Sequence, residues 1–184
     1  REIPGYSMAK GELWRHSQAA AITSRHIARK NKVKNAEQIY VAGLLHDIGK
    51  VIMGHYIEDA YAEVIDMVID TNVTFLQAEE EVLGFNHAQV GARIAEKWNL
   101  PPNLVEAIAY HHSPEEATIN PQMTCITHIS DAITMMLGIG LGVDGMAYSI
   151  SNYAVEVLGF HLGTEIDKIM AEVSDILSDE DSFY

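Results

Sequence analysis

The stretch that most constrains this chain is Leu44-Leu45-His46-Asp47-Ile48-Gly49-Lys50. An adjacent histidine and aspartate end an apolar run that begins at Val41. Burying an unpaired imidazole and carboxylate beside two leucines is costly, so the pair needs a partner. Because neutral imidazole and carboxylate are both ligands for zinc, iron, manganese or nickel, we expect one or two divalent transition metal ions here.

Apolar residues recur along the chain at steps of three and four, which is the period of an α-helix, and period-two strand patterns are absent. The predicted fold class is therefore all-α, a compact multi-helix bundle. Capping boxes at Thr74/Gln77 and Asn86/Gln89 predict two helix starts, and a proline, Pro102, opens another helix. We expect Gly49 to break or cap the helix that carries His46. The other expected helices cover residues 8–30, 36–45, 57–70, 123–137, 147–158 and 164–177, and the helix at 123–137, apolar nearly all round, should be central.

Several histidines and aspartates share faces with core residues on five of these helical stretches. Taken singly, each has an ordinary explanation: a core histidine can be hydrogen-bonded, and Asp131 can pair with a buried lysine or arginine. Taken together they are hard to explain without a cation, because the chain offers few cations to pair with Asp131 and inward histidines fill a core poorly. His128, one turn before Asp131, is a candidate hydrogen-bond partner of that carboxylate. The predicted metal ligands are His16, His46, Asp47, His87, His111, His112 and Asp131.

Composition excludes several classes of protein. The net charge of −14 argues against general nucleic-acid binding and against an anionic membrane surface. The longest apolar stretch, 123–141, contains His128 and Asp131 and is a poor membrane span. One cysteine, Cys125, excludes an internal disulfide and fits a reducing, cytoplasmic setting. The chain begins at Arg1 and enters a helical pattern almost at once, so we expect it to be part of a longer protein.

The ordered histidines and aspartates resemble those of the HD superfamily of metal-dependent phosphohydrolases. The likeness is greatest to the HDOD domains, which are HD-related output domains of bacterial signalling proteins, and it covers about residues 5 to 160. It implies one HDOD-type domain over 1–184, without an N-terminal helical half and with an acidic tail at 178–184. The matching stretches are Gly11-Glu12-Leu13-Trp14-Arg15-His16-Ser17, Ala42-Gly43-Leu44-Leu45-His46-Asp47-Ile48-Gly49-Lys50, Asn86-His87-Ala88-Gln89-Val90-Gly91-Ala92, Trp98-Asn99-Leu100-Pro101 and Ala107-Ile108-Ala109-Tyr110-His111-His112.

The resemblance also implies roles. His16, His46, Asp47 and Asp131 would surround one metal, and Asp47 would bridge to a second metal held by His87 and by His111 or His112. In an enzyme of this class the two metals activate a water that attacks phosphorus, and Asp47 and Lys50 would be the catalytic side chains. Lys50 would stabilise charge on the phosphoryl oxygens. The alternative is a solvated lysine after a helix, but its position three residues from Asp47 favours a place in the site.

Three functions follow from this comparison. The first is a signalling output domain that keeps its metal site and binds a nucleotide, a phosphoester or a protein partner. The second is an active phosphohydrolase or phosphodiesterase acting on a nucleotide or cyclic nucleotide. The third is a metal-free interaction module. The sister HD-GYP branch follows its His-His pair with Gly-Tyr-Pro, whereas this chain has Ser113-Pro114-Glu115, so the substrate of that branch is not implied.

Overall fold

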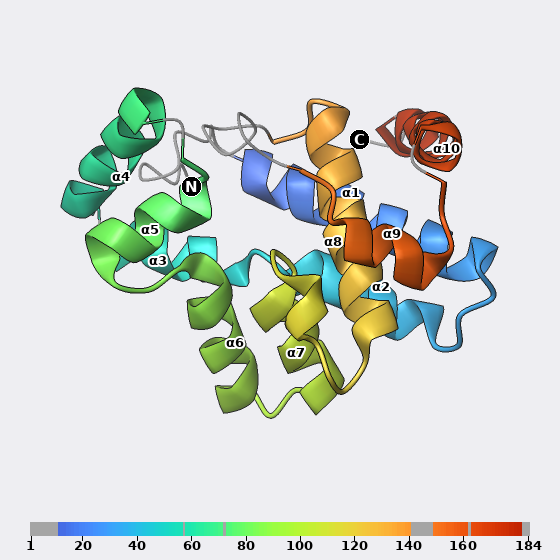
Figure 1. Cartoon of the computed structure of the whole chain (residues 1–184), viewed down its shortest axis with the longest axis horizontal. Helices are drawn as coiled ribbons and strands as arrows, with labels where there is room; N and C mark the ends of the chain where they lie inside the picture. The colour runs from blue at the N-terminus through green and yellow to red at the C-terminus, as the bar shows by residue number, and fades with distance from the viewer. Residues whose placement is uncertain (1–10, 57, 72, 141–148, 162, 182–184) are drawn as a thin grey trace.

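The all-α prediction is confirmed. The computed structural model describes residues 11–56, 58–71, 73–140, 149–161 and 163–181, and this part of the chain contains helices and no strand (Figure 1). The helices are α1 (Glu12–Lys30), α2 (Ala36–Leu45), α3 (Ile48–Tyr56), α4 (Glu58–Thr71), α5 (Phe75–Leu83), α6 (His87–Lys97), α7 (Pro102–Tyr110), a 3₁₀ turn η2 (Pro114–Glu116), α8 (Pro121–Met136), α9 (Asn152–Leu158) and α10 (Thr164–Asp181).

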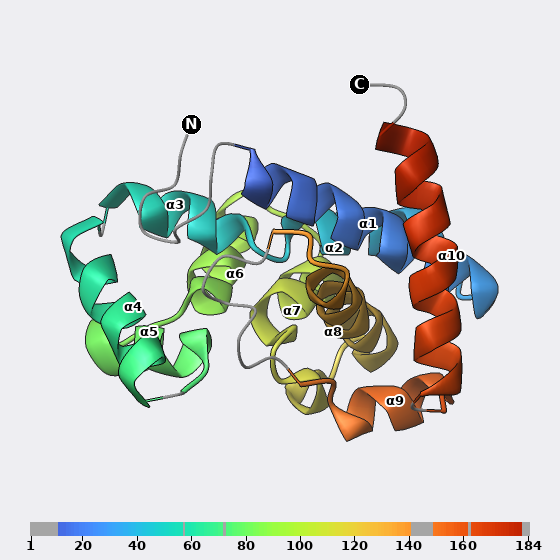
Figure 2. The same ribbon diagram turned by 90° about the horizontal axis from the view of Figure 1, so that it is seen from above.

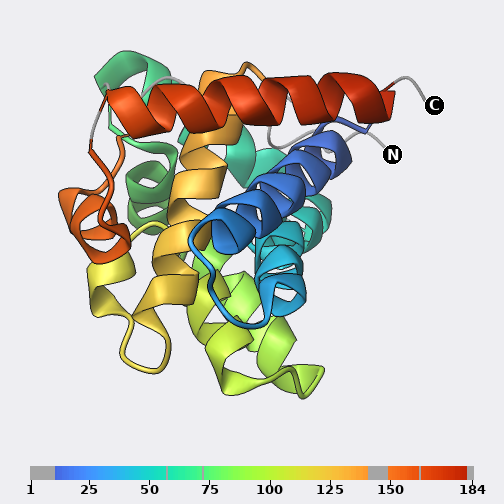
Figure 3. The ribbon, with the colours of Figure 1, turned by 90° about the vertical axis from the view of Figure 1, so that its right-hand side faces the viewer.

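Helix α8 lies at the centre of the fold, as its apolar sequence predicts. Every residue from 123 to 135 is buried, and α1, α2, α7 and α9 pack around it. The main hydrophobic core forms along this helix and extends to α10 through Ile166, Ile169 and Val173. Helix α10 contacts α1, and the two helices lie on the same side of the molecule (Figure 3). Asp131 therefore projects from the most enclosed element of the structure.

A second, smaller core lies at the other end of the molecule. Helices α4 and α5 are at one end and α9 and α10 at the opposite end, in both Figure 1 and Figure 2. The smaller core joins α4 and α5 to α3 and to the start of α1. Its buried members are Leu13, Met53, Tyr61, Val64, Val68, Phe75 and Ala78. The α4–α5 unit, residues 58–83, thus has its own apolar packing and contacts α3 and the start of α1.

The predicted start signals are confirmed. Both capping boxes form, with the Thr74 and Asn86 side chains accepting hydrogen bonds from the backbone N–H groups of Gln77 and Gln89. Pro102 is the first residue of α7. Local hydrogen bonding therefore places these helix starts where the sequence predicts them.

The interpretation of Gly49 as a helix break was wrong. Gly49 lies in the first turn of α3, which runs from Ile48 to Tyr56. A Cβ atom at this position would overlap the carbonyl oxygen of His87, so glycine allows α3 and α6 to meet backbone to backbone. The residue is needed for packing and does not end a helix.

The C-terminal part also differs from the expected ranges. Helix α9 begins at Asn152, whereas the predicted helix began at residue 147. Residues 147 and 148 of that predicted helix lie outside the described part of the chain. Helix α10 continues to Asp181 instead of ending at residue 177, and residues 182–184 of the predicted acidic tail lie outside it too. Among the described helices, none has both the length and the apolar character needed to cross a membrane.

Candidate metal site

The His-Asp pair lies at the junction of α2 and α3, in the middle of the structure. Both side chains are buried, with His46 fully enclosed. Gly43, three residues earlier, lets α2 approach α1 closely, since a Cβ there would come within 2.8 Å of the Ala20 carbonyl oxygen. This close packing of two helices brings His46 beside His16 on α1.

The first cluster contains His16, His46 and Asp131, from α1, the α2–α3 junction and α8. The Asp131 Oδ1 atom lies 2.9 Å from His16 Nε2 and 3.5 Å from His46 Nε2. The two Nε2 atoms are 3.3 Å apart. These three side chains are arranged so that one metal ion could bind all of them.

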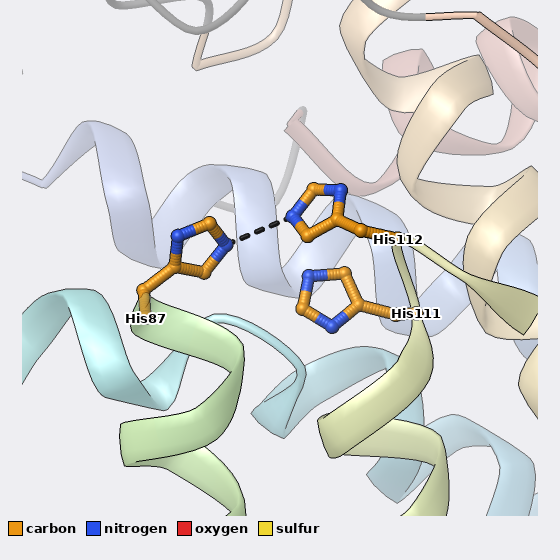
Figure 4. A group of neighbouring side chains, drawn as sticks. All are labelled: His87, His111 and His112. Atoms are coloured by element: carbon orange, nitrogen blue, oxygen red, sulfur yellow. Dashed lines mark hydrogen bonds between the residues drawn. The ribbon is translucent and has the colours of Figure 1, made fainter. Parts of the chain in front are cut away.

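The second cluster contains His87, His111 and His112, from the start of α6 and the end of α7 (Figure 4). The Nε2 atoms of His87 and His112 are 2.9 Å apart, and the rings of His111 and His112 have centroids 4.0 Å apart. His87 and His111 are fully buried, whereas His112 is partly exposed. The sequence left open whether His111 or His112 accompanies His87, and the structure brings both to it.

Asp47 lies between the two clusters and faces each with a different oxygen. Its Oδ2 atom lies 3.5 Å from His46 Nε2 and 3.8 Å from His16 Nε2. Its Oδ1 atom lies 3.4 Å from His87 Nε2 and 3.8 Å from His111 Nε2. A carboxylate in this position can bridge two cations.

Four of the rings have their other nitrogen held by an oxygen acceptor. The Nδ1–H groups of His16, His46 and His111 donate to the carbonyl oxygens of Ile139, Gly43 and Ile108, at 3.0, 2.8 and 2.8 Å. The Nδ1–H of His87 donates to the Glu79 carboxylate at 2.6 Å. In a neutral ring this tautomer leaves Nε2 as a lone pair, and all four Nε2 atoms point to the centre of the site.

The charges in the site are arranged for a cation. Burial acts to raise the pKa of Asp47 and of Asp131. At Asp47 the charges of Lys50 and the neighbouring histidines outweigh burial, and at Asp131 His46 and His16 do so, which holds both pKa values well below the usual range. Burial lowers the pKa of His111 to about 3 with help from His46, so this ring is neutral at pH 7. Burial also lowers the pKa of His46, but Asp47 and Asp131 outweigh it and raise that pKa to about 9.

Two buried atoms of the site form no hydrogen bond with the protein. They are Asp47 Oδ1 and His111 Nε2, one an anion oxygen and the other a ring lone pair. Buried polar atoms without partners are rare, and both of these are metal-ligating atoms that face the same space. The donor set of imidazole nitrogen and carboxylate oxygen fits divalent zinc, iron, manganese or nickel.

Lys50 also lies at this site, as predicted from its spacing. Its Nζ atom is 2.8 Å from Asp47 Oδ2, and the side chain is buried. Lys50 is therefore ion-paired with the central carboxylate and is not the solvated lysine that the sequence also allowed.

Two polar residues near the site were missed or misassigned from the sequence. Glu79 on α5 is fully buried and bonds to His87, but within the run Glu79-Glu80-Glu81 it reads as part of a solvated face. Its spacing of four residues from the buried Phe75, which places both on one face of the helix, was the available signal. The hydrogen bonds shown for His128 go to the His111 carbonyl at 2.7 Å and the Ser151 N–H at 2.9 Å, instead of to Asp131 as predicted.

Comparison with known families decides the assignment. A family model described as HDOD domain matches residues 1–114, which is more than half of the chain. The chain belongs to the HDOD domain family. The resemblance inferred from the motifs is thereby confirmed. All candidate ligands of this HDOD domain except Asp131 lie inside the matched residues.

Individual relatives extend this result. An uncharacterized protein from Treponema pallidum (strain Nichols) is 28% identical over 81 residues, which is 42% of this chain and 16% of that protein. An HDOD domain protein with unknown function from Geobacter sulfurreducens has a solved structure that is 25% identical with a TM-score of 0.69, covering 94% of this chain and 58% of that one.

Two further solved structures share the fold at lower identity. A "Putative phosphohydrolase" from Shewanella amazonensis SB2B is 20% identical with a TM-score of 0.71, covering 91% of this chain and 60% of that one. A "Putative signal transduction protein" from Marinobacter aquaeolei VT8 is 18% identical with a TM-score of 0.72, covering 90% of this chain and 38% of that one. This HDOD domain therefore spans less than two thirds of each of these relatives.

Proposed function

We propose that this HDOD domain is a bacterial signal-transduction output domain that holds two divalent transition metal ions. One ion would be bound by the first cluster and Asp47 Oδ2, and the other by the second cluster and Asp47 Oδ1. The observation that carries the proposal is the position of Asp47, whose two oxygens lie within 3.8 Å of histidine Nε2 atoms from different clusters. The single cysteine, Cys125, is buried and free, which supports a reducing, cytoplasmic setting.

A cavity next to the second cluster is consistent with binding of a small-molecule ligand. It has a volume of about 930 Å³, lies between α5, α6 and α7, and has His112 in its wall. Phe85 and Tyr110 contribute aromatic surface, and Asn86 and Gln89 contribute amides. This mixture suits a nucleotide or another phosphoester whose phosphate reaches His112.

The charged lining of the cavity weighs against tight binding of a phosphate group, and therefore against rapid phosphate chemistry. Arg93 and Lys97 are opposed by Glu80, Glu96 and Glu116, and Arg93 is paired with Glu96 at 3.0 Å. Little uncompensated positive charge is therefore available to an anionic ligand. A protein partner of the signalling pathway is the other ligand class that we propose for an output domain.

One observation favours a second candidate, an active phosphohydrolase or phosphodiesterase. Lys50 places a buried ammonium 2.8 Å from the central carboxylate, where it could stabilise charge on a phosphoryl oxygen. When bound, two divalent cations supply an activated water at neutral pH. In that reaction Asp47 would hold both cations and Lys50 would contact the phosphoryl group.

A hydrolysis assay distinguishes the two candidates. The purified chain is reconstituted separately with iron, manganese and zinc and offered bis-p-nitrophenyl phosphate and linear and cyclic nucleotides. The output-domain proposal predicts metal binding without turnover above that of Asp47→Ala. Turnover that Asp47→Ala abolishes, and that the remote surface variant Glu172→Gln retains, would establish the second candidate and contradict the first.

A further inference from the structure

A carboxylate outside the predicted ligand set, Glu79, has an environment that requires explanation. Its side chain is fully buried on α5. One oxygen, Oε2, accepts from the His87 backbone N–H at 2.9 Å and from the His87 ring Nδ1–H at 2.6 Å. The other, Oε1, accepts from the Tyr61 hydroxyl at 3.1 Å. These hydrogen bonds compensate for the cost of burying the carboxylate, so the fold stabilises a glutamate at this position.

The two bonds to His87 fix both its backbone and its ring. His87 is the first residue of α6, so its N–H has no acceptor within the helix. The N-cap side chain, Asn86, accepts from Gln89 instead, which leaves the His87 N–H to Glu79. Because the same carboxylate oxygen holds the ring Nδ1–H, Nε2 carries the lone pair and is directed at Asp47 Oδ1, 3.4 Å away. A carboxylate in this role orients a ligating histidine and increases its basicity.

Tyr61 connects this carboxylate to the smaller hydrophobic core. Its side chain is 1% exposed and stacks on Phe75 with ring centroids 6.1 Å apart. Tyr61 is on α4 and Glu79 is on α5, so the hydrogen bond between them joins both helices of the α4–α5 unit to the second histidine cluster. The packing of that unit and the orientation of His87 are thus connected through two hydrogen bonds.

We propose that Glu79 is a positioning residue that orients His87 for the second metal ion and, through Tyr61, couples the order of the α4–α5 unit to occupancy of that site. The coupling of the α4–α5 unit to metal occupancy rests on the proposed two-metal function. Binding of a cation by His87 would strengthen the Glu79 hydrogen bonds, and these would hold Tyr61 and the two helices. In the other direction, a signal that shifts the α4–α5 unit would weaken the second metal site and leave the first intact.

The test compares Glu79→Gln with Glu81→Gln, a matched change at an exposed glutamate on the same helix. Zinc and manganese titrations should show affinity at one site weakened about 10- to 100-fold in Glu79→Gln, with the other site unchanged and Glu81→Gln like wild type. Two sites of wild-type affinity in a folded Glu79→Gln variant would overturn the proposal.

Tyr61→Phe keeps the ring in the core and removes only the hydroxyl, so it tests the coupling even if Glu79→Gln fails to fold. Hydrogen exchange of residues 58–83 should slow on metal addition in the wild type, and Tyr61→Phe should lose most of that protection. Equal protection in the variant would overturn the coupling.

The histidine tautomer separates this inference from the two-metal proposal. Ring ¹⁵N chemical shifts of His87 in the metal-free chain should show the Nδ1–H tautomer in the wild type and a mixture in Glu79→Gln. A wild type that binds fewer than two metals, yet shows this tautomer change, would contradict the proposed function and support the positioning role. An unchanged tautomer would overturn the positioning role.

Discussion

Gly49 and His87 lie so close that no side chain fits between them. The backbone of α3 meets the carbonyl oxygen of His87, the residue that begins α6, and a Cβ atom on Gly49 would overlap that oxygen. The contact positions Asp47 and His87 relative to each other, because each lies within two residues of it. Helix packing through a glycine thus sets the distance between the central carboxylate and the second histidine cluster.

Gly49→Ala should therefore destabilise the protein and separate the two clusters. Because the obstacle is backbone, the neighbour cannot simply rotate away, and we expect a loss of about 3 kcal/mol or more in the free energy of unfolding. Gly84→Ala is the control: nothing lies within 4 Å of a Cβ there, and its φ of +78° alone should cost about 1–2 kcal/mol. Urea unfolding followed by circular dichroism measures both, and equal losses would contradict this packing role.

Asp47 and Asp131 should differ in how many metal ions they control. Asp47 faces both clusters, so Asp47→Ala should abolish binding of both ions. Asp131 pairs with His16 and His46 of the first cluster, so Asp131→Asn should remove one ion and leave the other. Metal content per chain after reconstitution and desalting measures this difference. Full metal stoichiometry in Asp47→Ala would show that the bridging assignment is wrong.

Metal removal should lower stability, because the cation would satisfy the buried lone pairs and the two carboxylates. A ligand that binds only the folded state at 100 times its Kd adds about 2.7 kcal/mol per site. Thermal melts with saturating zinc and with a chelator should differ accordingly, and Asp47→Ala should show no such difference. A wild-type melting temperature independent of metal would contradict a site that binds in the folded state.

Glu106 should make the unfolding free energy depend on pH in the acid range. Burial acts to raise its pKa, but backbone N–H donors at Asn120, Ile119 and Thr118 outweigh it and hold the pKa below the usual value. A lowered folded-state pKa gives stability that is complete above the ordinary glutamate pKa and is lost as pH falls below it.

Glu106→Gln replaces one carboxylate oxygen by an amide N–H group, which would face either the Asn120 N–H or the N–H groups of Thr118 and Ile119. We therefore expect a loss of about 1–3 kcal/mol in the free energy of unfolding at pH 7. The difference in unfolding free energy between wild type and variant should decrease as pH falls below about 4.5, the ordinary pKa of glutamate. Denaturant unfolding at pH 7 and pH 4 measures this difference. A difference that is constant or grows on acidification would be inconsistent with the hydrogen bonds described.

Glu172→Gln should have a much smaller effect, although Glu172 also has several partners. It joins α10 to α1 by accepting from Lys30 at 2.7 and 2.9 Å and pairing with His26 at 2.8 Å. The glutamate is 33% exposed, so solvent and salt weaken these contacts, and we expect a loss below about 1 kcal/mol. The loss should decrease in 1 M salt, and a loss as large as that of Glu106→Gln would show that burial is not the deciding factor.

Local signals in the sequence predicted the helix starts well. The capping boxes at Thr74 and Asn86 and the proline at Pro102 act within one helical turn, so their hydrogen bonds and dihedral preferences need no knowledge of the rest of the fold. The sequence also predicted that His16, His46 and Asp131 lie on inward faces, because the helical period alone places them among core residues. The structure brings these side chains together from three separate elements.

The residues missed or misread depend on contacts between distant segments. Gly49 looks like a helix break because glycine is a poor helix former, and only the approach of α6 shows why it is needed. Glu79 looks solvated because its neighbours are glutamates, and only the position of His87 shows its partner. His128 bonds to the peptide carbonyl of His111, just after α7, which no spacing within α8 could indicate. Such pairings arise from tertiary packing and have no local signature.

The most direct test of the central claim is the metal content of the purified wild-type chain, measured by mass spectrometry before and after reconstitution with iron, manganese or zinc. Asp47 between two histidine clusters predicts close to two ions per chain. One ion would contradict the bridging role of Asp47. No bound metal, even after reconstitution, would contradict the metal site altogether and favour a metal-free interaction module.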